Sequence, residues 1–326
     1  MTVSNNLAVG LFFIGLVSAP VLCFLPKLAQ FVWLYSKPSQ LRRYLHADKE
    51  GKPAWALVTG ATDGMGEQFA HELSRQGFNV VLHGRNPAKL ARVQSELTSA
   101  FPERAFRTLV ADCTAISCHS CSTKDTHNVD FDAIVSALAD INLTVLINNA
   151  GGGISPVYQY LHDSSTEKIL ETTNLNALFP LLLQAKLLPQ LIQNSPALVI
   201  NMGSIVDVGL PVVATYAASK RFLNCMAESL TREMAMVGRD VEVLAIRAGG
   251  TSGTSSNREK ATFFEPEART MARAALARAG CGQPVVIGYW PHAIQAAVLQ
   301  ALPSFVLEPA VRNLSRARME QELAMQ

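Results

Sequence analysis

A short apolar run that ends in a glycine-rich turn is the feature that most limits how this chain can fold. Residues 54–58 (AWALV) are apolar, residues 59–66 (TGATDGMG) carry three glycines, and residues 65–77 space their apolar side chains as a helix does. A strand, a glycine turn and a helix in this order form the context that a dinucleotide-binding turn requires. The glycines allow a close approach of the backbone to a pyrophosphate, and the helix N-terminus offers it free N–H groups.

Strand and helix patterns continue to alternate after this turn, without a linker between them. The expected helices cover residues 65–77, 87–100, 130–140, 165–192 and 216–237, and the expected strands 54–58, 79–85, 106–110, 143–147, 197–202 and 241–246. Pro180 predicts a break inside the long fourth helix. The alternation predicts an α/β fold, a doubly wound parallel sheet of Rossmann-like type, in a single domain over residues 53–326.

A polar stretch over residues 113–128 is expected to be a surface insertion. It holds three cysteines and two histidines, but no second paired set of ligands accompanies them, so we predict no metal site. The cysteines and histidines are Cys113, Cys118, Cys121, His119 and His127.

Tyr216 and Lys220 lie four residues apart on an expected helix, which places both on one face. A cation this close favours the phenolate and lowers the pKa of a tyrosine toward the range of a general acid–base catalyst. Ser204 comes twelve residues before the tyrosine, at the end of an expected strand. A serine there can hydrogen-bond a substrate oxygen and align it with Tyr216.

Together with residues 148–151 (NNAG), these motifs resemble the short-chain dehydrogenase/reductase family over residues 53–288. Within the family, the turn, the following residues 80–85 (VVLHGR) and an apolar N-terminus look most like the membrane-bound very-long-chain 3-oxoacyl-CoA reductase and 17-beta-hydroxysteroid dehydrogenase branch. Residues 248–249 (AG) depart from the Pro-Gly that the family commonly has there. That difference leaves the details of the following loop open.

The resemblance implies a catalytic set and a cofactor site. The catalytic set is Ser204, Tyr216, Lys220 and Asn176, with Asn174 as an alternative to Asn176 for holding a water in the proton relay. Arg85 stands where an acidic residue would bind the ribose of NAD and suits a 2′-phosphate instead, so we expect NADP(H); the alternative is that Arg85 only caps a solvated loop. The expected cofactor contacts are Gly60, Thr62, Asp63, Gly64, Met65, Gly66, Arg85, Asp112, Asn149, Tyr216 and Lys220.

The N-terminus predicts a membrane anchor. Residues 7–26 form a run of twenty without a charge, long enough to cross a bilayer, and no Lys or Arg precedes them as a cleaved signal peptide would require. We therefore assign residues 1–36 to the anchor and 37–52 to a basic linker, which by the positive-inside rule leaves the catalytic domain in the cytosol. The resemblance suggests the endoplasmic reticulum as the membrane, and a possible homodimer built on the helices around Leu175 and Leu223.

Residues 283–307 carry no Asp, Glu, Lys or Arg, but three prolines argue against a second membrane span. They form either a core strand and a buried helix or a surface at the membrane interface. The net charge of +2 gives no argument for nucleic acid. We expect NADPH-dependent reduction of a ketone on an apolar substrate of 3-oxoacyl, steroid or polyketide-like type. The alternatives are a ketoreductase or dehydrogenase of specialised metabolism acting oxidatively, and a non-catalytic NADP(H)-binding membrane scaffold.

Overall fold

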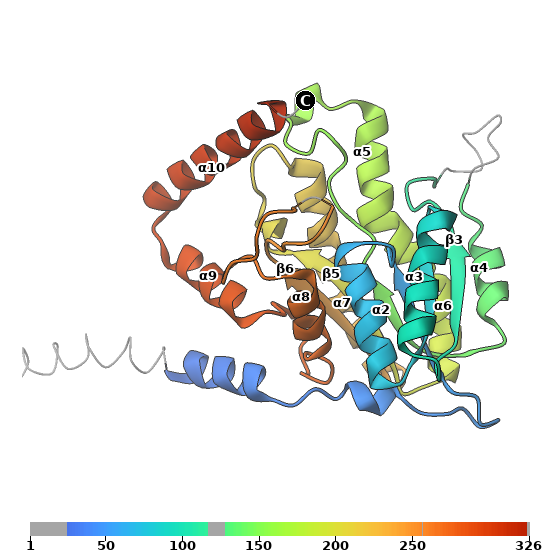
Figure 1. Ribbon diagram of the computed structural model, residues 1–326. Coiled ribbons are helices and arrows are strands. Elements are labelled where there is room, and N and C mark those ends of the chain that lie inside the picture. Colours follow the sequence, from blue (N-terminus) through green and yellow to red (C-terminus); the bar gives the residue numbers. More distant parts are fainter. Residues whose placement is uncertain (1–24, 117–127, 256, 325–326) are drawn as a thin grey trace, which may run out of the picture. The chain divides into compact units, whose positions relative to one another are not determined.

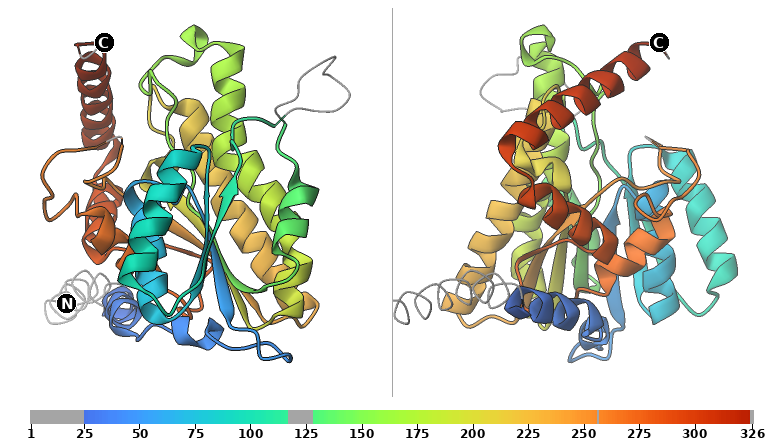
Figure 2. Two further views of the ribbon diagram at one scale, coloured as in Figure 1. Left: turned by 45° about the vertical axis from the view of Figure 1, so that its right-hand side comes forward. Right: turned by 90° about the vertical axis from the view of Figure 1, so that its left-hand side faces the viewer.

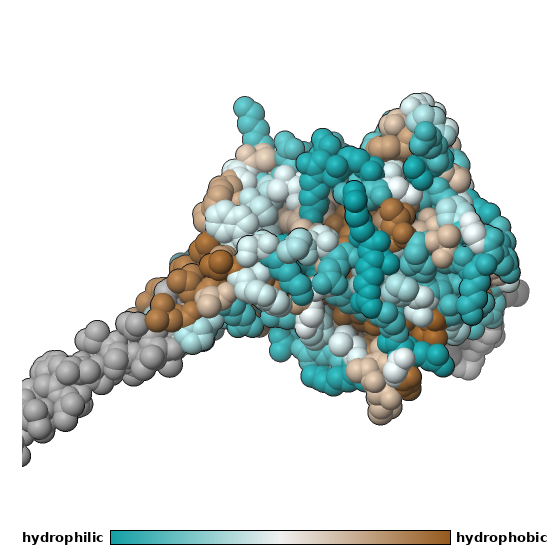
Figure 3. Space-filling view, turned by 90° about the horizontal axis from the view of Figure 1, so that it is seen from below, coloured by the Kyte–Doolittle hydropathy of each residue, from teal (hydrophilic) through white to brown (hydrophobic). Residues whose placement is uncertain are grey.

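The computed structural model describes residues 25–116, 128–255 and 257–324. The chain divides into two compact units, Met1–Ser39 and Gln40–Gln326. In the first unit a helix covers residues 25–36, and it exposes Leu25, Val32 and Trp33. Figure 3 shows apolar side chains along this helix. The predicted membrane span over residues 7–26 lies outside the described residues except for its last two.

The second unit is built on a sheet of seven parallel strands in the order β3-β2-β1-β4-β5-β6-β7 (Figure 1). The strand order reverses between β1 and β4, so the chain winds outward in both directions from that point. The strands are β1 (Ala54–Thr59), β2 (Asn79–Gly84), β3 (Phe106–Val110), β4 (Asn142–Asn148), β5 (Ala197–Ser204), β6 (Val241–Ala248) and β7 (Val285–Val286). The predicted doubly wound α/β fold is confirmed.

Helices cover both faces of this sheet. They are α2 (Gly64–Gln76), α3 (Pro87–Ala100), α4 (Phe131–Leu138), α5 (Thr166–Thr173), α6 (Phe179–Gln193), α7 (Ala214–Met236) and α8 (Ala268–Leu276). One face carries α2, α3 and α8, and the other carries α4, α6 and α7 (Figure 2). The central strands β1, β2, β4 and β5 are buried along their whole length, because helices pack on both of their sides.

Local capping explains why the helices begin where the sequence predicts. The side chains of Asp63, Asn86, Asp130 and Ser165 precede α2, α3, α4 and α5, and each accepts a hydrogen bond from a backbone N–H of the first turn. Helix α2 is capped at its C-terminus by Gly77, whose φ of 112° lies in the left-handed region that glycine adopts readily. These short-range contacts set the helix starts before any packing is considered.

The long helix predicted over residues 165–192 is broken, but not by the proline alone. A π turn over Asn174–Leu178 separates α5 from α6, and Pro180 lies in the first turn of α6. Among the described residues, Thr166–Gln193 is the one stretch long and apolar enough to cross a membrane, with a mean hydropathy of 1.3. Core helices also meet that criterion, and here Leu183, Leu187 and Leu191 are fully buried in the apolar core.

Cys113 corrects the expectation that residues 113–128 are all surface. Its side chain is buried in the same apolar cluster as Val81 and Phe179, because the chain turns inward directly after β3. Burial raises the pKa of this thiol. Residues 117–127, with the other two cysteines and both histidines of the expected insertion, lie outside the described residues.

The C-terminal region matches neither expected arrangement completely. Strand β7 lies in the sheet beside β6, as a core strand should. The following helix, α9 (Trp290–Ala301), is not the buried helix of the first expectation. It exposes the apolar side chains of Trp290, Ile294 and Val298. Pro303 lies between α9 and a last helix, α10 (Ser304–Ala324), which the sequence did not predict.

Candidate active site

The predicted site residues gather at the carboxyl edge of the sheet, where β1 and β4 diverge. The glycine turn follows β1, Asn149 follows β4, Ser204 ends β5 and Ala248 ends β6. In open parallel sheets this edge is where ligands bind, because the outward windings leave a crevice there.

The glycine turn packs its backbone closely against the end of β4. A Cβ at Gly66 would lie 2.0 Å from the Gly60 carbonyl oxygen and 2.6 Å from Asn149 Nδ2, so no side chain is tolerated there. Asp63 Oδ1 accepts the Gly64 N–H at 2.7 Å and starts α2. Met65 lies in the first turn of α2. In the glycine turn before this helix, the Thr62 carbonyl accepts a hydrogen bond from Arg92. The first turn leaves N–H groups without partners inside the helix.

Asn149 links this turn to β1 and keeps one acceptor unused. Its Nδ2 donates to the Thr59 carbonyl at 3.0 Å, and its backbone N–H donates to Thr59 Oγ1 at 2.9 Å. The Asn149 Oδ1 atom is buried and has no partner among the described residues. A buried acceptor without a partner is costly, so it suits a donor from a bound group. Together with the glycine turn, it fits the phosphate and ribose region of a dinucleotide.

Arg85 and Asp112 mark the outer end of this region. Arg85 directly follows β2, is exposed, and makes no hydrogen bond or ion pair with any residue that the structure describes. Asp112 follows β3, and its Oδ1 accepts from the N–H and the hydroxyl of Thr114, both at 3.0 Å. Asp112 is thereby held in a local turn, with its second carboxylate oxygen not used in that turn.

Tyr216 and Lys220 lie in the first two turns of α7, and Ser204 hydrogen-bonds Tyr216. The Lys220 Nζ donates to the Met202 carbonyl at 2.8 Å and lies 5.7 Å from the centroid of the Tyr216 ring. Burial lowers the pKa of Lys220 to about 8. Burial also raises the pKa of Tyr216, which the Ser204 hydrogen bond only partly offsets.

The direction of this tyrosine shift corrects the expectation from spacing. A nearby ammonium was expected to lower the pKa of Tyr216. In the structure the loss of water around the phenol is the larger effect, and Lys220 makes its hydrogen bond to the Met202 backbone. The phenol is therefore held in its protonated form.

The π turn decides the position of the two candidate asparagines. Asn176 Oδ1 accepts the Gly152 N–H and its Nδ2 donates to the Gly152 carbonyl, both at 2.9 Å. A Cβ at Gly151 would lie 2.7 Å from Lys220 Nζ and 2.8 Å from Asn176 Oδ1, so these two groups flank Gly151. Asn174 instead donates to the carbonyls of Thr114 and Ile116, near β3. The structure thus brings Asn176, and not Asn174, to Lys220.

His292 is a residue of this region that the sequence did not single out. Its fully buried ring lies at the start of α9, where Nδ1 accepts the Gly249 N–H at 3.1 Å and Nε2 lies 2.8 Å from the Phe264 carbonyl. The second contact requires a proton on Nε2, so the imidazole is neutral with a defined tautomer. One ring thereby ties together both ends of the segment that follows β6. A lone histidine in an apolar stretch carries no signal for this role.

A pocket opens to the surface beside Tyr216. Its walls come from residues 153–172 and 212–216, and they combine apolar side chains such as Ile154, Val157 and Ile169 with polar ones. Lys168 is the one cation of the lining; its Nζ donates to Gln159 Oε1 at 2.6 Å and to the Pro156 carbonyl.

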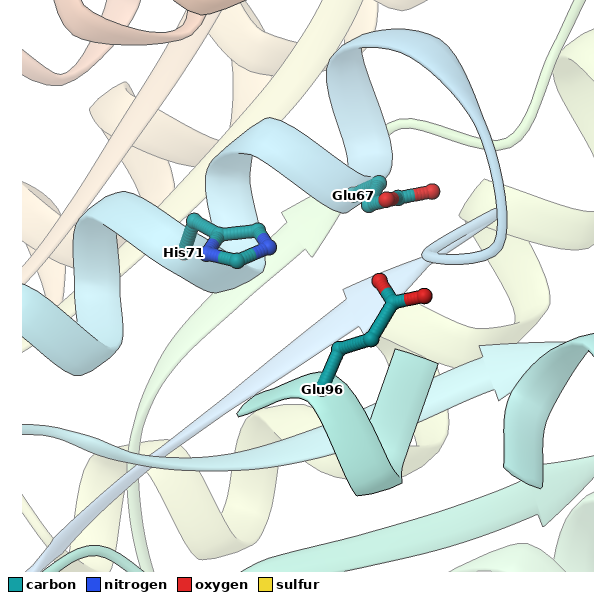
Figure 4. Close-up of side chains that lie close together, drawn as sticks. All are labelled: Glu67, His71 and Glu96. Carbon is teal, nitrogen blue, oxygen red and sulfur yellow. The ribbon is translucent and has the colours of Figure 1, made fainter. Parts of the chain in front are cut away.

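Figure 4 shows the one group of possible metal ligands among the described residues, Glu67, His71 and Glu96. Their ligand atoms lie within 4.8 Å of one another. Arg92 already bonds both carboxylates, each at 2.9 Å. The cluster is part of an ion-pair network between α2 and α3, in which Arg92 bonds both carboxylates.

Comparisons with known proteins agree with this geometry. A family model described as short chain dehydrogenase matches residues 54–263. A very-long-chain 3-oxoacyl-CoA reductase of Caenorhabditis elegans is 30% identical over 273 residues, which are 82% of this chain and 81% of that protein. A putative steroid dehydrogenase of the same organism is 29% identical over 280 residues, covering 85% and 84%. A solved short-chain dehydrogenase from Sphingobium yanoikuyae, in complex with NADPH, has a TM-score of 0.58 at 22% identity and covers 77% of this chain and 96% of its own.

Proposed function

This chain belongs to the short-chain dehydrogenase family, and on that premise we propose that it reduces a ketone on an apolar substrate to a secondary alcohol with NADPH. Its relatives include 3-oxoacyl-CoA reductases and steroid dehydrogenases, and they support ketoreductase activity on apolar substrates in general. Beyond this general activity, we propose NADPH as the cofactor and a 3-oxoacyl, steroid or polyketide-like ketone as the substrate.

One observation carries this proposal: Ser204, Tyr216, Lys220 and Asn176 come together beside a pocket that Ile154, Val157 and Ile169 help to line. Ser204 reaches Tyr216 by a hydrogen bond, and Lys220 and Asn176 flank Gly151 next to them. Four polar side chains from three elements, β5, the π turn and α7, converge here. Such a convergence in a pocket is typical of an active site.

The roles follow from the protonation states. A bound nicotinamide supplies hydride to the carbonyl carbon. The Ser204 hydroxyl donates a hydrogen bond to the carbonyl oxygen, and Tyr216 gives its proton to that oxygen as the C=O double bond becomes a C–O single bond. Because burial raises the pKa of Tyr216, the phenol is protonated at neutral pH and can donate its proton in the reductive reaction.

Lys220 and Asn176 complete the proton path in this proposal. The pKa of about 8 leaves Lys220 mostly protonated at pH 7, so its ammonium can hydrogen-bond a ribose hydroxyl and stabilise charge on Tyr216 as the phenol loses its proton. Asn176 holds the Gly152 backbone on the other side of Gly151, and in this proposal it helps to hold a water beside Lys220. That water would return a proton to Tyr216.

Arg85 supports NADPH over NADH. It is an exposed cation at the end of β2 without a described partner, at the point where an acidic side chain would favour NAD. A guanidinium is always charged and can bond a phosphate with two N–H groups. The NADPH bound by the solved relative agrees with this choice.

We also propose a membrane location. The uncharged run over residues 7–26 and the basic residues after it support a single-pass anchor in the endoplasmic reticulum, with the domain over residues 53–326 in the cytosol. An apolar substrate partitions into that membrane. A homodimer remains part of the proposal, although the Leu223 side chain is buried within the chain.

The test is NADPH oxidation by the detergent-solubilised full chain. The panel is a long 3-oxoacyl-CoA, a 17-oxosteroid and a simple aromatic ketone, with NADH as the cofactor control. Turnover of a long ketone with NADPH is expected. Silence across the panel with NADPH still bound would overturn the proposed substrate classes and favour a non-catalytic scaffold, and turnover with NADH alone would overturn the cofactor assignment.

A further inference from the structure

The last helix of the chain binds the backbone of the loop that walls the pocket. Glu322, near the end of α10, accepts the Val157 N–H on Oε1 at 2.7 Å and the Tyr158 N–H on Oε2 at 2.8 Å. These partners are 165 and 164 residues apart in the sequence. Figure 1 shows the C-terminal end of α10 beside the segment between β4 and α5.

That loop is part of the pocket beside Tyr216. Val157 lines the pocket, and its side chain packs so closely on Gly153 that a Cβ there would lie 2.5 Å from Val157 Cγ1. Tyr158 lies close enough to Tyr216 to contribute to the raised pKa of that phenol. The two amides that Glu322 binds therefore belong to residues that face the site from the substrate side.

The contact has the chemistry of a specific anion site. A carboxylate that accepts two successive backbone N–H groups makes two charge-assisted hydrogen bonds, each stronger than a neutral one. Glu322 is half-buried, whereas Glu320 on the same helix is exposed and makes no hydrogen bond or ion pair with any described residue. The neighbouring Lys168, whose own bonds hold Pro156 and Gln159, lies within electrostatic reach of Glu322.

A second residue on the same face of α10 reaches the segment that follows β6. Arg318 lies one turn before Glu322, and its Nη2 is 3.9 Å from Glu265 Oε1. Glu265 belongs to the segment after β6 and accepts from Asn257 Nδ2 at 3.2 Å. The helix thus contacts both the loop that lines the pocket and the segment after β6, although the Arg318 pair is exposed and weak.

We propose that Glu322 is a positioning residue for the substrate pocket: through the amides of Val157 and Tyr158 it holds the pocket wall in the shape that binds the apolar ketone. The inference rests on the proposed function, and it adds a residue outside the catalytic set and outside the region that the family model matches. Glu322 does not touch the reacting atoms. It acts through Tyr158 and Val157.

The first test needs no activity. Amide hydrogen exchange is measured on the full chain in detergent for wild type, Glu322→Ala, Glu322→Gln and Glu320→Ala. Exchange at Val157 and Tyr158 should rise at least about tenfold in Glu322→Ala, since a charge-assisted bond at each amide is lost. Glu322→Gln should give a smaller rise, because it keeps one acceptor oxygen, and Glu320→Ala should match wild type. Unchanged exchange at the two amides in Glu322→Ala would overturn the contact.

The second test is kinetic and uses the ketone that wild type reduces. Glu322→Ala should raise KM about tenfold, lower kcat less, and leave the Kd of NADPH unchanged, because the loop shapes the substrate side only. Its kcat profile should also move along the pH axis, since Tyr158 no longer holds its place beside Tyr216. Equal KM and pH profile despite faster exchange would overturn the positioning role. If wild type reduces no ketone, the proposed function fails while the exchange experiment still decides the contact.

Discussion

The two sides of the site hold their functional groups in different ways. On the side of β1 to β3, short-range bonds fix the polar groups: Asp63 binds the next residue, Asp112 the residue two further on, and Asn86 the residue three further on. On the side of β4 to β6, the bonds join distant segments. Lys220 donates to a carbonyl 18 residues away in the sequence. His292 accepts from Gly249, which is 43 residues away, and Glu322 accepts from Val157, which is 165 residues away.

This difference suggests a division of labour. Short-range turns and caps form wherever their few residues occur, so the polar groups after β1, β2 and β3 depend little on the rest of the chain, although Asn149 reaches the glycine turn from the end of β4. The substrate side depends on how separate elements pack, so small changes far away can alter it. A change on the first side should affect cofactor binding or local stability, and a change on the second should affect turnover or KM.

The largest expected effect comes from Tyr216→Phe, which removes the proton donor and nothing else. Loss of a general acid should lower kcat by about 10²–10⁴-fold. The Kd of NADPH, followed by its fluorescence, should stay unchanged because the glycine turn is untouched. Retained turnover would show that the chemistry does not use Tyr216, and a lost cofactor affinity would break the separation between the two sides.

Arg85→Gln should weaken NADPH binding, whereas Tyr216→Phe should lower kcat and leave NADPH binding unchanged. Losing the charge beside the ribose 2′-phosphate should weaken NADPH binding by about 10–100-fold, the cost of one or two charge-assisted hydrogen bonds. The Kd of NADH should hardly change. Lys89→Gln is the matched control, since Lys89 is also exposed and lies in the first turn of α3. Equal losses in both variants would point to net charge instead of a specific contact.

His83 should make stability depend on pH on the cofactor side. Its ring is fully buried at the end of β2, both nitrogens lack partners among the described residues, and burial lowers its pKa from 6.5 to about 4. Above pH 6.5 both the folded and unfolded states are neutral. Between pH 6.5 and 4 only the unfolded state takes up the proton, so stability falls as the pH falls. The loss at pH 5 should be about 2 kcal/mol.

Urea unfolding at pH 7 and pH 5 measures this, with His83→Leu as the comparison. The variant should lose about 2 kcal/mol less than wild type between the two pH values. Any remaining dependence includes His292, whose pKa burial lowers as well. The same pH dependence in both proteins would mean that His83 has a partner or reaches water in solution.

The smallest effect is expected at the Glu67, His71 and Glu96 cluster. Glu96→Gln should change the free energy of unfolding by at most about 0.5 kcal/mol, as for other exposed ion pairs. A thermal shift with and without Zn²⁺ should show no stabilisation, because Arg92 already occupies both carboxylates. A rise in Tm with Zn²⁺ that Glu96→Gln abolishes would contradict the ion-pair interpretation.

The sequence allowed most of the fold up to β6 to be predicted, because α2, α3, α4 and α5 each begin at a capping side chain and each central strand is an apolar run of the expected length. It also allowed the catalytic candidates to be named, since Tyr216 and Lys220 share a helix and Ser204 ends a strand. It could not choose between Asn174 and Asn176. That choice depends on the extra residue of the π turn, which rotates Asn176 toward Gly152, and no local signal predicts such a turn.

Other predictions were wrong or missing because they also depend on contacts between residues that are distant in the sequence. The pKa of Tyr216 was expected to fall because spacing shows the neighbouring cation, but spacing does not show how much water packing removes. Cys113 was assigned to the surface because its neighbours in sequence are polar, whereas its neighbours in space are apolar. His292 and Glu322 stand alone in the sequence, and their partners lie on other elements.

By itself the sequence determined the alternation of strands and helices, the glycine turn with its capping aspartate, and the set of polar side chains that the carboxyl ends of the strands bring to one edge. Each of these rests on backbone preferences and contacts within a few residues. The tertiary structure alone decided which asparagine meets Lys220, that burial keeps Tyr216 protonated, and that α10 holds the loop beside the pocket. Those outcomes depend on which distant surfaces exclude water together, and that is a property of the packed chain.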